Sequence, residues 1–196
     1  MSIQARRERE RAERQQLIIT TARALAEAEG WEAVTTRRLA ERVEYSQPVL
    51  YRHFKGKDAI MAAVAVEGFA DLAAELRAAR TSASEPRQAL ADVSAAYAAF
   101  AEQRPALYDA MFSQTVDLPF AAPQAPAALH AAFGELSQAL QPQAGDDDLS
   151  LLTETLWAGL HGLVTLKRGG RLRCEDHDRR LALLIDHFSS RPADRT

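Results

Sequence analysis

The stretch "TTRRLAERVEYSQPVLYRHFKGK", residues 35–57, contains two short helical signals separated by a tight turn. Thr35 is a favourable N-cap for a first helix over residues 37–43. Ser46 can cap a second helix over about residues 47–54. The first helix is expected to bury Leu39, Ala40 and Val43. A short helix, a tight turn and a second short helix with small or polar residues at its start is the order of a helix-turn-helix.

In a helix-turn-helix, the N-terminal residues of the second helix meet base edges in the major groove of DNA. Four side chains here suit that chemistry. Arg37 can offer a bidentate donor pair to guanine, and Gln47 can pair with adenine. Pro48 and Val49 can press against a thymine methyl group. Arg37 and Gln47 have no evident role in a core, so the sequence favours DNA contact for both.

Three further side chains on or after the second helix can reach phosphates, namely Tyr51, His53 and Lys57. Lys57 also opens the next helix, where free backbone amides add to an anion site. For Tyr51, packing within the helical unit is as good an interpretation as contact with a phosphate.

Charge is distributed unevenly along the chain. Residues 1–57 contain twelve Lys/Arg and eight Asp/Glu, a net charge of +4, whereas the remainder carries twelve against nineteen, a net charge of −7. A basic end on an acidic body predicts that only the N-terminal end meets a polyanion. Residues 6–16 alternate in sign and are expected to form a solvated, partly frayed helix start; an arm that touches phosphates is the alternative.

The stretch "TTRRLAERVEYSQPVLYRHFKGKDAI" resembles the DNA-binding segment of the tetracycline-repressor (TetR) family. The shared anchors are Thr35, Leu39, Ala40, Leu50, Tyr51, His53, Phe54 and Lys57. The resemblance implies base reading by Arg37, Gln47 and Pro48, together with Val49 and Tyr51, and phosphate contacts by Thr36, His53 and Lys57. Glu44 departs from the pattern, because the family usually has a glycine at that turn. The full set of expected DNA-contacting residues is Thr35, Thr36, Arg37, Ser46, Gln47, Pro48, Val49, Tyr51, Arg52, His53 and Lys57.

The rest of the chain is also predicted to be helical. Alanine is abundant, β-branched residues are sparse, and apolar residues recur at steps of three and four. Helices are expected over 57–80, 87–103, 127–140, 149–169 and 175–189, with a short one after Pro105. The resemblance implies about nine helices in two domains: a helix-turn-helix domain over 1–56, and an effector-binding and dimerisation domain over 57–196.

The stretch "WAGLHGLVTLKRGGRL", residues 157–172, resembles a C-terminal domain type of the same family, recognised by Trp-x-x-x-His-Gly. This implies a homodimer formed by the last two helices, binding a palindromic operator, and a small-molecule effector. Ala158, Gly159 and Gly162 are small enough for close helix approach. Aromatic and soft side chains suit a pocket for a hydrophobic or aromatic effector, although a packed core is an equally good reading for each. They are Tyr97, Phe100, Tyr108, Met111, Phe112, Phe120, Trp157 and His161.

Other functions find little support. No Ser/His/acid set, Gly-rich phosphate loop or spaced ligand cluster stands out, so we expect no enzyme activity, cofactor or metal. The acids and histidine of "CEDHD", residues 174–178, are too closely spaced on a helix start to converge on one ion. The single cysteine and the absence of long apolar runs predict a cytoplasmic protein without a membrane partner. A DNA-binding or helical interaction protein without an effector remains the alternative.

Overall fold

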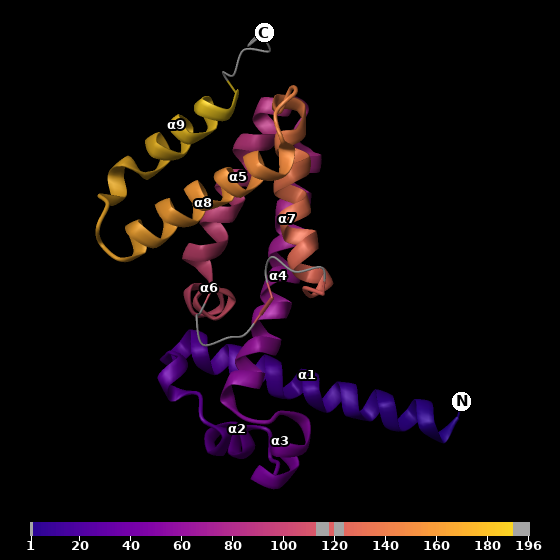
Figure 1. Ribbon diagram of the computed structural model, residues 1–196. Coiled ribbons are helices and arrows are strands. Elements are labelled where there is room, and N and C mark those ends of the chain that lie inside the picture. Colours follow the sequence, from indigo (N-terminus) through magenta and orange to yellow (C-terminus); the bar gives the residue numbers. More distant parts are fainter. Residues whose placement is uncertain (1, 113–117, 120–123, 190–196) are drawn as a thin grey trace. The chain divides into compact units, whose positions relative to one another are not determined.

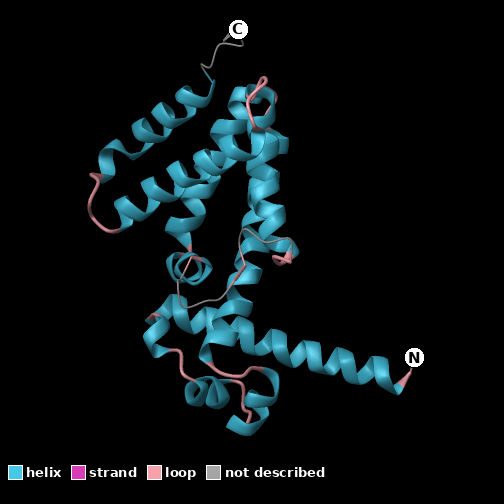
Figure 2. Cartoon of the chain, in the orientation of Figure 1, coloured by secondary structure: helices cyan, strands magenta, loops and turns pink. Residues whose placement is uncertain are grey.

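The computed structural model describes residues 2–112, 118–119 and 124–189, and every regular element among them is helical (Figures 1 and 2). Nine α-helices and three short 3-10 turns follow one another in this part of the chain. The prediction of an all-helical chain with about nine helices is therefore confirmed over the described residues. The helices are α1 (Ile3–Glu29), α2 (Thr36–Arg42), α3 (Gln47–His53), α4 (Lys57–Ser82), α5 (Pro86–Gln103), α6 (Pro105–Met111), α7 (Ala127–Leu140), α8 (Leu149–Arg168) and α9 (His177–Ser189).

The first of two compact units comprises residues 1–68 and 104–124, and contains α1, α2, α3, the start of α4, and α6. Its core is built from apolar residues spaced three or four apart on these helices, since such residues share one helix face. Burying a leucine or isoleucine contributes about 1.5–3 kcal/mol. Fully buried side chains of this unit include Ile18, Leu25, Leu39, Leu50 and Ile60.

The second compact unit comprises residues 69–103 and 125–196, and contains the rest of α4 together with α5, α7, α8 and α9. Helices α8 and α9 pack closely, because a Cβ added at Gly159 would lie 2.9 Å from Leu184 Cδ1. The close approach predicted from small residues is thus present at Gly159, whereas a Cβ at Gly162 would meet nothing within 4 Å. Since α4 belongs to both units, the division into domains 1–56 and 57–196 stays a prediction.

A buried carboxylate connects α4 to α7 in the second unit. The Glu135 side chain is only 3% exposed, and its two oxygens accept hydrogen bonds from Arg77 Nε at 2.7 Å and from Arg80 Nε at 2.9 Å. Both arginines reach toward solvent, with side chains 60% and 23% exposed. An acid in this position is tolerated because both of its oxygens are paired with charged donors.

Helix ends follow the expected capping chemistry. Thr35 Oγ1 accepts from Arg38 N at 3.2 Å at the start of α2, and Asp148 Oδ1 accepts from Ser150 N at 2.9 Å at the start of α8. The N-terminal stretch is helical from Ile3, and residues 6–16 are mostly exposed, as predicted for a solvated helix start. Ser2 caps it, and the Arg6–Glu10 pair supports its first turns at 2.9 Å.

Candidate nucleic-acid interface

Helices α2 and α3 are held together by a four-residue turn. Tyr45 N donates to Ala40 O at 2.9 Å, which closes the turn behind α2. Leu39 of α2 and Leu50 of α3 are both fully buried. Because the apolar faces of both helices point inward, their opposite faces and the N-terminal end of α3 are left for contact with a partner. The arrangement is a helix-turn-helix, in which α2 supports α3 and the N-terminal end of α3 is exposed to a binding partner.

Glu44 adopts a left-handed backbone conformation in this turn, with φ at 57°. This conformation crowds the Cβ of any L-residue other than glycine and costs roughly 1–2 kcal/mol. The sequence already singled out this position, because an acid stands where the resembling family prefers glycine. The turn therefore keeps the shape that glycine favours although its residue is glutamate.

Replacing Glu44 by glycine should stabilise the protein by about 0.5–1 kcal/mol, since relief of the left-handed strain outweighs the extra chain entropy of glycine. DNA binding should be at least as strong, because a carboxylate near the expected phosphate track is removed. Urea unfolding and fluorescence anisotropy measure the two effects. Glu41→Gly inside α2 is the matched control and should destabilise by about 1 kcal/mol. A loss of DNA binding in Glu44→Gly would show that the turn depends on its glutamate.

The predicted base-reading residues belong to α2 and α3 of the first unit, and most of them are exposed. The Arg37 side chain is 80% exposed, and its Nε contacts Glu41 Oε1 at 3.0 Å. Tyr51 is 51% exposed, so packing in the core is not its role, and its hydroxyl lies 3.5 Å from Thr36 Oγ1. Val49 and Thr36 are half-buried. The remaining exposed members of the predicted set are Thr35, Ser46, Gln47, Pro48 and Arg52.

Lys57 makes an internal contact that sequence reasoning missed. Its Nζ donates to Trp31 O at 2.6 Å, and Trp31 Nε1 in turn donates to Ala106 O at 2.7 Å. Glu27 completes the connection, accepting from Ala106 N at 3.2 Å and Leu107 N at 2.8 Å. These contacts, which we call the α1–α6 clamp, tie the end of α1 and the start of α4 to α6. A phosphate contact by Lys57 remains a prediction.

His53 lies half-buried at the end of α3, close to several cations. Partial burial, followed by the guanidinium groups of Arg11, Arg14 and Arg52, lowers the pKa of His53 below its usual range. The imidazole is therefore neutral near pH 7 and can offer a phosphate a single N–H donor. The positive charge expected at this end of α3 comes from the arginines, two of them on α1.

The residues predicted to bind an effector fall in both compact units. In the second unit, Trp157 Nε1 donates to Tyr97 Oη at 3.1 Å, and the rings of Trp157 and His161 lie 6.5 Å apart. Phe100 is fully buried on the same helix as Tyr97. Burial lowers the pKa of His161, so this ring is neutral near pH 7. Tyr97, Trp157 and His161 are thus brought together.

Three other predicted effector residues, Tyr108, Met111 and Phe112, belong to the first unit. Tyr108 and Met111 are buried on α6, and the rings of Tyr108 and Phe112 lie 4.7 Å apart. Gly68 of α4 lets α6 approach closely, since a Cβ there would lie 2.8 Å from Met111 Sδ. Phe120 lies outside the described residues.

Two features of the described residues bear on other functions. None of the helices there is long and apolar enough to cross a membrane. In the same part of the chain, no group of three or more His, Cys, Asp or Glu side chains is placed to hold a metal ion.

Solved structures share this fold along most of the chain. A protein of unknown function from Rhodococcus sp. RHA1 superposes with a TM-score of 0.73 at 25% identity, covering 90% of this chain and 93% of that one. The TetR family transcriptional regulator PfmR from Thermus thermophilus gives a TM-score of 0.61 at 19% identity, covering 88% and 97%. The second likeness is one of fold alone.

Sequence comparison adds the family. Tetracycline repressor protein class C from Escherichia coli is 52% identical over 48 residues, which span 24% of this chain and 22% of that protein. The chain thus matches about a fifth of that relative's length. Residues 18–64 match the model of the bacterial regulatory proteins of the tetR family, and residues 90–188 match a tetracyclin repressor-like C-terminal domain. The chain therefore belongs to the tetR family of bacterial transcriptional regulators and carries the DNA-binding domain of that family.

Proposed function

We propose that the protein binds a palindromic operator as a homodimer and is released from it by a small hydrophobic or aromatic effector. The proposal that the protein reads DNA rests on one observation, the exposed N-terminal end of α3. Gln47 and Pro48 lie there outside the core, with Tyr51 one turn later. Side chains at this end of a second helix reach base edges when that helix enters the major groove. The exposed Arg37 of α2 is also part of the proposed interface.

Gln47→Ala should cost about 1–3 kcal/mol of binding per half-site and relax base preference at one position, because a bidentate pair with adenine is lost. Fluorescence anisotropy measures this on DNA selected from random sequence with the wild-type chain. Gln138→Ala, an exposed glutamine on α7, is the matched control and should bind like the wild type. If both variants bind DNA with the same affinity and the same base preference, Gln47 does not contact a base.

The dimer is proposed to form through α8 and α9. On the surface of the second unit, large apolar side chains remain exposed on these helices: Leu151 at 61%, Leu166 at 42% and Leu183 at 62%. Along α8, the exposed leucines share a face with Thr155, Ala158 and Gly162, because these positions are spaced three or four apart. Such a face suits helix packing against a symmetry mate, as in a four-helix bundle.

We propose that a bound effector acts on the helix-turn-helix formed by α2 and α3 through the α1–α6 clamp, and that DNA is released as a result. Helix α6 carries Tyr108 and Met111, both in the proposed effector set, and its first amides are held by Glu27 of α1. A ligand that shifts α6 would move the end of α1 through these hydrogen bonds. Such coupling has to be reciprocal, so a releasing ligand must bind more weakly to the DNA-bound protein.

A panel of small aromatic and hydrophobic compounds tests this proposal. Each is screened by its effect on the melting temperature of the full chain, since a ligand that binds the native state raises it. Compounds that stabilise the protein are then added to the DNA complex. At least one should weaken DNA binding. If stabilising compounds leave DNA affinity unchanged, the sensor proposal is wrong, and the alternative of a DNA-binding regulator without an effector holds.

A further inference from the structure

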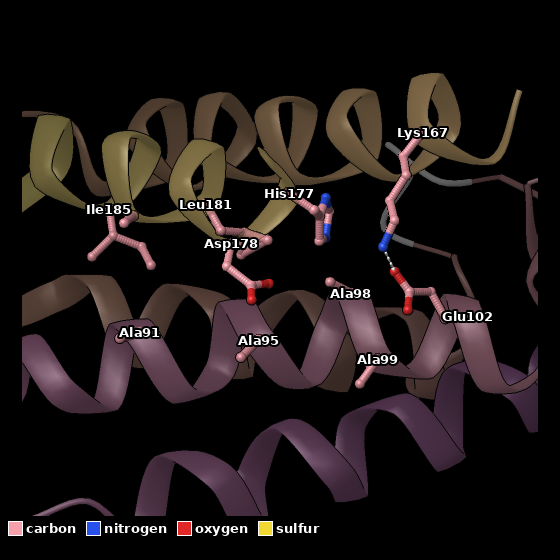
Figure 3. A pocket seen from close by; sticks show the side chains of 11 residues that line it. Ala91, Ala95, Ala98, Ala99, Glu102, Lys167, His177, Asp178, Leu181 and Ile185 are labelled. Atoms are coloured by element: carbon pink, nitrogen blue, oxygen red, sulfur yellow. Dashed lines mark hydrogen bonds and ion pairs between the residues drawn. The ribbon is translucent and has the colours of Figure 1, made fainter. Parts of the chain in front are cut away.

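The second unit contains a groove between α5 and α9, with a volume of about 340 Å³ (Figure 3). Its floor is a face of α5 on which Ala91, Ala95 and Ala98 recur at steps of four and three, so their methyl groups point the same way. Leu181 and Ile185 of α9 form the facing wall. We call this space the α5–α9 groove. A volume of this order accommodates a small ligand.

His177 projects into the α5–α9 groove from the start of α9 (Figure 3). The residue is 6% exposed, and neither Nδ1 nor Nε2 has a hydrogen-bond partner within the described part of the chain. Leaving buried polar atoms unpaired costs stability, and most such atoms in proteins are paired. An unpaired imidazole between apolar walls therefore points to a polar group that binds beside it.

The charges around His177 determine which polar group fits. Burial, followed by the nearby Lys167 ammonium, lowers the pKa of His177, so its ring is neutral near pH 7 and offers one acceptor and one donor. The Lys167 ammonium pairs with the Glu102 carboxylate at one end of the groove. The Asp178 carboxylate points toward α5 near Ala95 (Figure 3). The groove therefore carries one excess negative charge beside a neutral acceptor.

We propose that the α5–α9 groove binds a small amphiphilic amine, with its ammonium between Asp178 and His177 and its apolar part on the alanine floor. The ammonium would donate one hydrogen bond to the imidazole and pair with the carboxylate. An anionic ligand is disfavoured, because the Lys167–Glu102 pair is neutral overall and the Asp178 carboxylate would repel the anion. The proposed effector residues are a different set, and this site requires neither DNA binding nor dimerisation.

Benzylamine is a suitable probe, used with the full-length chain labelled with ¹⁵N at histidine. Titration should shift the imidazole signals of His177 to saturation, whereas benzyl alcohol, of the same shape but uncharged, should bind at least fivefold more weakly. Asp178→Asn should weaken benzylamine binding roughly fivefold, the scale of one solvent-exposed ion pair. Asp146→Asn, which removes the same charge at an exposed position outside the groove, should leave binding unchanged. Ala95→Leu, at an exposed position, should fill the groove and abolish the shift without changing the helical circular dichroism.

Three outcomes would overturn the proposal. Benzylamine could leave the His177 signals in place, in which case the groove binds no amine. Benzyl alcohol could bind as tightly as benzylamine, in which case the groove is only an apolar surface. Asp178→Asn and Asp146→Asn could weaken binding equally, in which case the effect is one of general charge. None of these results affects the proposed reading of DNA, which is measured separately.

Discussion

Replacing both Arg77 and Arg80 by leucine is expected to lower the free energy of unfolding by about 3–5 kcal/mol. The physical reason is the Glu135 carboxylate, whose side chain is 3% exposed and whose two oxygens are paired with these guanidinium groups of α4. Without them, a buried charge loses its compensation. Urea unfolding at neutral pH and a fixed protein concentration measures the change.

The same cluster provides its own controls. Glu135→Leu alone should cost far less, because the two arginines already reach toward solvent and can be hydrated. The triple variant Arg77→Leu, Arg80→Leu, Glu135→Leu should recover most of the stability lost in the double variant, since no buried charge remains. If the triple variant is as unstable as the double, the loss arises from packing of the arginine stems and the explanation by an uncompensated charge is wrong.

Leu183→Glu is expected to convert the protein to a monomer. Operator binding should weaken by about 10²–10⁴-fold, because a monomer has only one helix-turn-helix and loses the gain from bivalent binding. Leu183 is 62% exposed on α9, so the change leaves the core of the second unit intact. A charge on the proposed dimer face would be desolvated without a partner on association. Sedimentation velocity reports the oligomeric state, and anisotropy reports the affinity for DNA.

Leu17→Glu is the control for sedimentation, because Leu17 is also an exposed leucine, at 45%, but lies on α1 in the other compact unit. It should sediment like the wild type. A Leu183→Glu variant that remains dimeric would place the dimer face elsewhere. A monomeric variant that keeps full operator affinity would show that binding does not require two linked helix-turn-helix units.

Local chemistry accounts for the features that the sequence predicted well. The cap at Thr35 and the span of α7 over Ala127–Leu140 depend on residues within one turn of each boundary. The left-handed backbone at Glu44 was not among these predictions, although the family's usual glycine marked the position as unusual. The start of the last helix differs from the prediction of Glu175: α9 begins at His177, because Cys174–Asp176 forms a 3-10 turn first.

Contacts between distant segments could not be predicted in this way. Glu27 and Leu107 are eighty residues apart, and nothing in the sequence near either one indicates that a carboxylate of α1 holds the first amides of α6. Glu135 offers only a weak signal, an acid among the apolar residues of α7. The effector residues were predicted from residue type alone. Their division between two compact units depends on tertiary packing, which residue type does not encode.

Two copies of the N-terminal end of α3 are proposed to read a palindromic operator. Repeated selection of DNA from a random library by the full-length wild-type chain tests this proposal most directly. An inverted repeat should be enriched, with half-site centres about one helical turn (34–36 Å) or more apart along the DNA. Enrichment of a single unrepeated site, or recovery of DNA without any shared sequence, would contradict the proposal.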